Sequence, residues 1–169
     1  MMNKARCIRD FTRRVMKGTG RSRPIVADAR GFINLSGDIS EMASEMENVQ
    51  ALYKKEAGLR IRGEIARIDK TEIDGDNSNR IAEIAHQFAG YYIGKGFQTA
   101  YGIYDEGSHY AIWYAINSVS YADGAKYKRN DHDIREEEQN CLNTIIADVT
   151  EKEIPKEQRF DFDTLEYHI

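Results

Sequence analysis

FQTAYGIYDEGSHYAIWYAINSVSYADGAKYKRN, from Phe97 to Asn130, is the stretch that decides the predicted fold. Residues 97–104 alternate as in a half-buried strand, residues 105–108 are turn formers, and residues 109–121 form a long β-prone run. The stretch therefore predicts two antiparallel strands joined by a tight turn. The Asp123–Gly124 pair predicts a second turn, because glycine accepts the positive φ that such a turn requires.

The second of these strands presents two different surfaces, because successive side chains of a strand point to opposite faces. One face is apolar enough to cover a core and consists of Tyr110, Ile112, Tyr114 and Ile116. The other face mixes polar and aromatic residues with alanines: His109, Ala111, Trp113, Ala115 and Asn117. This mixture is typical neither of a core nor of a solvated surface, so the second face is the candidate site.

The periodicity of the remaining chain predicts an α+β domain. Helices are predicted over residues 4–17, from Asp38 or Ser40 to about residue 55, from residues 76–79 to about residue 94, and after residue 130, with a strand over residues 59–69. These elements predict a central antiparallel sheet with helices packed mainly on one face. We divide the chain into a basic N-terminal helix and connector (1–23), the α+β domain (24–150) and an acidic C-terminal extension (151–169).

Composition is that of a soluble globular domain. The 169 residues carry a formal net charge of −4 and are enough to bury a sizeable core. No apolar run approaches the length of a membrane span, and the N-terminus lacks the apolar stretch of a signal peptide. Cys7 and Cys141 fit no metal or redox spacing. We therefore expect a cytoplasmic protein with reduced thiols and no membrane partner.

Basic residues are concentrated near the N-terminus, where a single acid, Asp10, accompanies them. They are Lys4, Arg6, Arg9, Arg13, Arg14, Lys17, Arg21 and Arg23. A cluster of this kind suits phosphate binding, whereas an ordinary solvated helix face paired with the acidic tail is the alternative. A second group of candidates for phosphate contacts follows the second turn and comprises Lys126, Lys128 and Arg129.

The end of the quoted stretch resembles the relaxases, the mobilisation nucleases of plasmids and integrative elements. Relaxases typically have a His-x-His-x-His strand, an apolar triplet with asparagine, a Ser/Thr-Val-Ser/Asn-Tyr/Phe run, Asp-Gly, and Lys-Lys-Tyr/Phe. Here AIN, SVSY and ADGAKY, between Ala115 and Tyr127, match the later part of that pattern. The resemblance extends from about Arg60 to about Ile146 and includes the segment IREEEQNCL. It implies a relaxase-like sheet, DNA as a partner and an origin on a mobile genetic element.

The catalytic part of the pattern is different in this chain. Aligned on Asn117, the second and third metal-binding histidines of the family are replaced by Ala111 and Trp113, and only His109 is kept. Tyr104 stands where a histidine often ends the preceding strand. The family's nucleophilic tyrosine near the N-terminus corresponds to Phe11.

These replacements predict a vestigial site without a confident catalytic residue. In the family, imidazoles hold a divalent cation against the scissile phosphate while a tyrosine attacks the phosphorus. A catalytic metal site needs about three protein ligands, so His109 by itself is a weak candidate ligand. We expect no cofactor, and Mg²⁺ or Mn²⁺ would be required only if nuclease activity survives.

Three functions remain open at this stage. The first is a catalytically inactive DNA-binding or accessory factor in plasmid or transposon mobilisation. The second is an active, metal-dependent relaxase with a rearranged site. The third is a scaffold or regulatory protein whose former active face binds a protein partner or a second copy. Trp113 correspondingly has two interpretations, stacking on a nucleobase or filling the vacated site, and Asn117 either contacts a phosphate or caps the sheet edge.

Overall fold

The computed structural model describes residues 4–30, 38–128, 132–151, 160–161 and 166–168, with side chains for residues 7–29, 38–128 and 132–151. Its elements are α1 (Lys4–Lys17), β1 (Val26–Arg30), α2 (Ile39–Leu52), β2 (Leu59–Asp69), the 3-10 turn η1 (Lys70–Ile73), α3 (Ser78–Gly94), β3 (Thr99–Asp105), β4 (His109–Asn117), α4 (His132–Thr150), β5 (Phe160–Asp161) and β6 (Glu166–His168).

The sheet is antiparallel throughout, as the sequence predicts. Its strands lie in the order β1-β3-β4-β2-β5, and β6 also pairs with β2. Strands β3 and β4 form the predicted hairpin, closed by the bond from the Glu106 amide to the His109 carbonyl (3.0 Å). Strand β4 pairs with β2 along its whole length, from Asn117 opposite Ile61 to His109 opposite Asp69. The α+β class and the antiparallel sheet are therefore confirmed.

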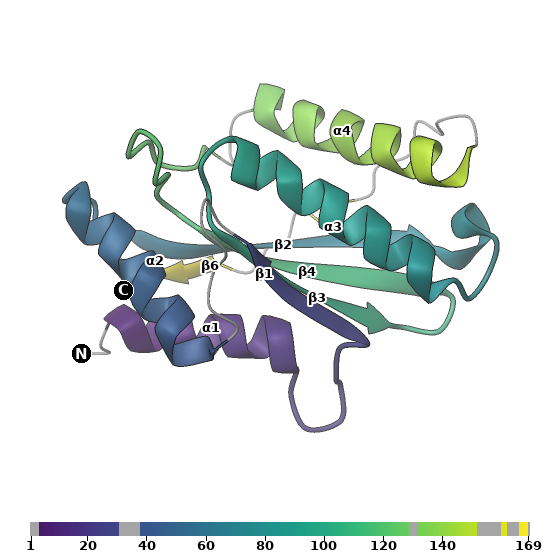
Figure 1. Cartoon of the computed structure of the whole chain (residues 1–169), viewed down its shortest axis with the longest axis horizontal. Helices are drawn as coiled ribbons and strands as arrows, with labels where there is room; N and C mark the ends of the chain where they lie inside the picture. Colours follow the sequence, from purple (N-terminus) through teal and green to yellow (C-terminus); the bar gives the residue numbers. More distant parts are fainter. Residues whose placement is uncertain (1–3, 31–37, 129–131, 152–159, 162–165, 169) are drawn as a thin grey trace.

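Helices cover both faces of the sheet, two on each, whereas the sequence prediction placed them mainly on one face. Helices α3 and α4 lie above the sheet in Figure 1, and α1 and α2 lie below it. The reason is the small side chains on the mixed face of β4 and on the neighbouring strand β3. Ala100 and Ala115 are completely buried there, so helices approach closely where the sequence suggested an open surface.

The face beneath α3 and α4 holds the larger core, as the alternation of β4 predicts. Tyr110, Ile112, Tyr114 and Ile116 are all buried in it. The ring of Tyr114 contacts Phe88 edge to face, and its hydroxyl donates to the Ala85 carbonyl at 2.9 Å. This face is therefore a buried aromatic core.

Local hydrogen bonds explain where two helices begin and where a turn forms. The Asp38 side chain accepts from the Glu41 amide and caps α2, and Asn77 caps α3 in the same way. The second predicted turn is present, since the Ser120 amide donates to the Ala125 carbonyl at 2.9 Å. Among the helices of the described residues, none combines the length and the apolar composition that crossing a bilayer requires.

Candidate functional site

The mixed face of β4 lies under α1 and α2, which close most of it. A compact apolar cluster occupies the space between these helices and the sheet. Its buried members are Ile8, Phe11, Val15, Ala29, Met42, Ala43, Met46, Ile61, Ala100 and Ala115. The centre of the face is therefore packed, whereas His109 and Trp113 on it are partly exposed.

Two positions that the resemblance marks as catalytic are part of this packing. Phe11, at the position of the expected nucleophile, is 1% exposed and has no hydroxyl. Ala111 is fully buried and packs with Ile65, Tyr104 and Trp113. Neither residue offers a metal ligand or an attacking atom.

Tyr104 fixes the C-terminal end of α1 to the sheet. Its hydroxyl donates to the carbonyls of Arg14 and Val15, at 2.9 and 2.8 Å. The Arg14 carbonyl also accepts from the Gly18 amide at 3.0 Å, whereas the Val15 carbonyl lies in the last turn of the helix, where backbone donors run out. Burial raises the pKa of Tyr104, which keeps the phenol protonated and able to donate. The residue that replaces a family histidine is thus an anchor for a helix.

Close backbone contact strengthens this anchor. A Cβ on Gly102 of β3 would lie 2.1 Å from the Val15 carbonyl oxygen, so only glycine fits beneath the end of α1. The chain then turns back, with reciprocal bonds between Thr19 and Ser22 of 3.0 and 2.7 Å. Gly18, at a φ of +72°, begins that turn.

A cavity of about 250 Å³ lies between this turn and the open end of the sheet face. Trp113 and Tyr104 supply aromatic surface, and their rings meet edge to face at 5.9 Å. Arg14, Thr19 and Ser22 line it from α1 and the following turn, and Glu106 lines it from the β3–β4 turn. Trp113 therefore covers Ala111 and at the same time forms a wall of an accessible cavity.

His109 orients Glu106 at the rim of the cavity. Its Nε2 lies 2.7 Å from Glu106 Oε2, and its Nδ1 lies 3.1 Å from the Ser108 hydroxyl. Arg67 Nε is 3.7 Å from the same carboxylate oxygen. Within the described residues, this histidine belongs to no group of three potential metal ligands.

Asn117, at the other end of β4, forms its hydrogen bonds with other residues of the protein. It is 0% exposed, and its Nδ2 donates to the Met46 carbonyl (3.1 Å) and Gln98 Oε1 (2.8 Å). Its Oδ1 accepts from Gln50 Nε2 at 2.9 Å. Both amide donors are occupied, so neither remains for a phosphate.

The candidate DNA-binding residues fall into two groups. Near the cavity, the exposed cations on α1 and the following turn are Arg13, Arg14, Lys17, Arg21 and Arg23, whereas Arg9 is half-buried. Arg13 faces Asp10 at 3.9 Å. Arg129 and the Arg6 side chain lie outside the described residues.

The second group lies at the opposite end of β4, roughly 27 Å away for a strand of this length. There Lys126 donates to the carbonyls of Ala57 (3.1 Å) and Leu59 (3.3 Å), and burial lowers its pKa. Lys128 is exposed beside it. The sequence could not show this separation, because it depends on the path of the chain across the sheet.

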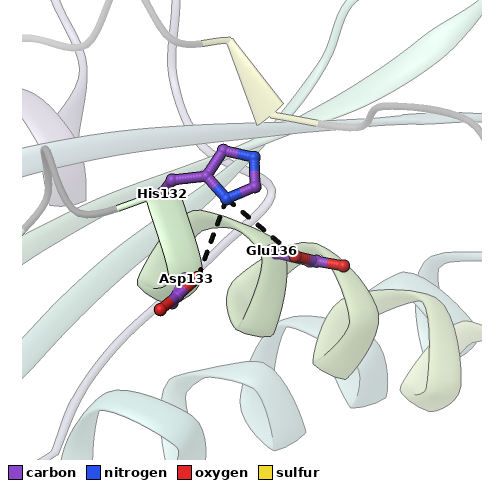
Figure 2. A group of neighbouring side chains, drawn as sticks. All are labelled: His132, Asp133 and Glu136. Carbon is purple, nitrogen blue, oxygen red and sulfur yellow. Dashed lines mark ion pairs between the residues drawn. The ribbon is translucent and has the colours of Figure 1, made fainter.

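A candidate metal-binding group lies elsewhere, at the start of α4. Figure 2 shows His132 with Asp133 and Glu136 as its neighbours. His132 Nδ1 is 3.8 Å from Asp133 Oδ1 and 4.0 Å from Glu136 Oε2. The three side chains are 87%, 96% and 64% exposed. Contacts of this length between exposed side chains are weak local charge pairing at the start of a helix.

Two buried carboxylates under α4 were not recognised from the sequence. Glu64 on β2 and Glu138 on α4 are each 2% exposed. Burial raises the pKa of Glu138 to about 9; Glu64 adds to the rise, and Arg62 and Lys95 oppose it. In a helix rich in exposed acids, only the helical spacing of Glu138 with Leu142 and Asn143 could have indicated its burial.

No family model, curated protein or solved structure matches the chain. The relationship to relaxases accordingly depends on the residues between Ala115 and Tyr127 and stays a prediction.

Proposed function

We propose that this chain is a relaxase-like factor of a mobile genetic element that binds DNA in the cytoplasm without cutting it. The observation that carries the proposal is the position of the exposed cations of α1 beside a cavity walled by Trp113 and Tyr104. Proteins that bind single strands combine the same two features, cations that follow the phosphates and aromatic rings that stack on bases.

The cations near the cavity have few local competitors for a phosphate. Asp10 faces Arg13, and Glu106 is held by His109 and Arg67. Arg14 lines the cavity itself, and Lys17 and Arg21 are exposed on either side of the turn that begins at Gly18. A strand that places one base against Trp113 would therefore bring its phosphates toward this basic group.

Loss of cutting is supported by what fills the catalytic positions. A buried phenylalanine and a buried alanine, Phe11 and Ala111, can neither attack phosphorus nor bind a cation. His109 is engaged with Glu106. Apolar contacts thus stand where the resemblance places reactive groups, which supports binding without cutting.

Salt-dependent binding of a labelled oligonucleotide tests the proposal. A plot of log K against log salt has a negative slope. Removing one side chain that neutralises a phosphate of a single strand should reduce the magnitude of this slope by about 0.7. We expect this decrease for Lys17→Gln and for Arg21→Gln, and about twice as much for the double variant. The control is Lys54→Gln, which removes an exposed charge just beyond the C-terminal end of α2. No binding at low salt, or equal slopes in all variants, would contradict the proposal.

A further inference from the structure

The cavity beside Trp113 has the dimensions and walls of a site for one planar ring. Its volume of about 250 Å³ is below the range of roughly 300–1,000 Å³ typical of sites for larger small molecules. The indole of Trp113 and the phenol of Tyr104 offer aromatic surface on the sheet side. A single nucleobase can be held there by stacking, which every base supports equally.

Glu106 adds a chemical preference that stacking lacks. Its Oε2 is 2.7 Å from His109 Nε2 and 3.7 Å from Arg67 Nε, so two neighbours fix the orientation of the carboxylate. Within the described residues, no hydrogen bond to Oε1 is present, and this side chain lines the cavity. An ionised carboxylate only accepts hydrogen bonds and has capacity for more than the one from His109.

Guanine is the base whose edge suits such an acceptor. It presents two adjacent donors, N1–H and the N2 amino group, which can bind both oxygens of one carboxylate. Adenine and cytosine place a ring acceptor next to their amino donor, and thymine places carbonyls on both sides of its N3–H. In each of these cases an acceptor would face the carboxylate, which disfavours binding.

Arg14 completes the arrangement. It lines the same cavity as Glu106 and Trp113, so a cation is available for the phosphate attached to the bound nucleoside. Thr19 and Ser22 close the cavity from the turn after α1. Stacking surface, a paired acceptor and a phosphate ligand thus come from three separate segments of the chain.

From this geometry we infer that the Trp113 cavity binds one unpaired guanine, with Glu106 accepting from its N1–H and N2–H groups. The inference rests on the proposed DNA-binding function for the source of the base, an unpaired guanine in a strand. A free guanine nucleotide would present the same edge, so the test includes both sources.

Trp113 is the single tryptophan of the chain, so its fluorescence reports on this cavity alone. The wild type is titrated with dT5, with the same pentamer carrying one central guanine, adenine or cytosine, and with GMP and AMP. We expect the guanine pentamer to quench Trp113 and to bind about tenfold more tightly than the others. Glu106→Gln should abolish the preference, because its amide keeps a single acceptor oxygen and sets its amino group against one of the two guanine donors. Glu83→Gln, an exposed change on α3, is the control and should keep it.

The outcomes separate the inference from the proposed function. If all pentamers bind equally and Glu106→Gln changes nothing, the guanine inference is overturned while DNA binding stands. If GMP quenches Trp113 but no pentamer binds, the guanine site is supported and the DNA-binding proposal fails. If neither GMP nor any pentamer quenches, both are overturned. Thermal unfolding of Glu106→Gln near the wild-type midpoint verifies that the variant is folded.

Discussion

Tyr104 shows how single residues separate this chain from the pattern it resembles. A histidine at this position would point an imidazole toward a metal, whereas the tyrosine hydroxyl holds two carbonyls of α1. Ala111 lies beneath it, and Trp113 packs beside both. Tyr104, Ala111 and Trp113 thus form a docking point for the end of a helix, with a small cavity beside it.

Removing the Tyr104 hydroxyl tests this exchange. In Tyr104→Phe the ring still packs, but the Val15 carbonyl loses the hydroxyl donor, and the Arg14 carbonyl retains only the Gly18 amide. We expect the free energy of unfolding to fall by about 1–2 kcal/mol, the usual effect of leaving buried acceptors unsatisfied. Urea denaturation measures the change. An unaltered midpoint would show that α1 does not depend on this hydroxyl.

Glu138 gives the molecule a specific pH dependence. Its pKa in the folded chain is about 9, above the ordinary value of 4.5. Between these values the folded state retains a proton that the unfolded chain has lost, so the free energy of unfolding falls as pH rises from about 4.5 to about 9. The slope from this group is at most about 1.4 kcal/mol per pH unit.

Replacing Glu138 with glutamine should remove that contribution. We expect Glu138→Gln to vary less than the wild type between pH 6 and pH 9 and to be the more stable protein at pH 9. Urea unfolding at the two pH values measures both. Glu136→Gln, an exposed change on the same helix, should retain the wild-type pH dependence. The same pH dependence in Glu138→Gln and the wild type would refute a buried, protonated carboxyl group.

At the scale of elements, long periodic segments were predictable and short non-local ones were not. Helix α1 and strand β2 have the predicted bounds, because their repeats of apolar residues are internal to each segment. Strand β1, with the sequence VADAR, has no such repeat and forms only by pairing with β3. Strands β5 and β6 have two and three residues and likewise depend on β2.

The candidate site shows the same limit. The sequence identified the face of β4 that carries His109 and Trp113, because strand alternation is a local rule. It could not show that α1 covers this face. The sequence of a single strand does not reveal whether its alanines are buried under a helix or border an open polar site. Nor could it place Glu106 opposite the turn after α1, which lies more than eighty residues earlier in the chain.

The contact between α1 and β3 yields a prediction at this scale. In Gly102→Ala the new Cβ would meet the Val15 carbonyl at 2.1 Å, so the end of α1 must move away from the sheet. We expect a decrease of about 1–3 kcal/mol in the free energy of unfolding, as for overpacked cores, together with weaker oligonucleotide binding.

Gly90→Ala on α3 is the matched control for this substitution. Its Cβ would meet nothing within 4 Å, and alanine is the better helix former. The control should therefore be neutral or stabilised by up to about 1 kcal/mol, with binding unchanged. If Gly102→Ala behaved like Gly90→Ala, α1 would not be held in the close contact that the structure shows.

The whole molecule has two unlike sides. One side, covered by α3 and α4, is an aromatic core that also buries Glu138. The other, covered by α1 and α2, has the cavity beside Trp113, which Arg14 lines; further exposed cations lie on α1 and the turn after it, although the chain as a whole carries a charge of −4. This polarity favours the approach of a nucleic acid to one end of the molecule.

Electrophoresis of one incubation tests most directly whether this side binds DNA without cutting it. An end-labelled, guanine-containing single strand is mixed with the protein and Mn²⁺ at low salt, then divided between a native and a denaturing gel. We predict a shifted band on the native gel and only full-length, unmodified strand on the denaturing gel. An unshifted native band, a shortened strand, or a protein adduct that survives denaturation would contradict the account.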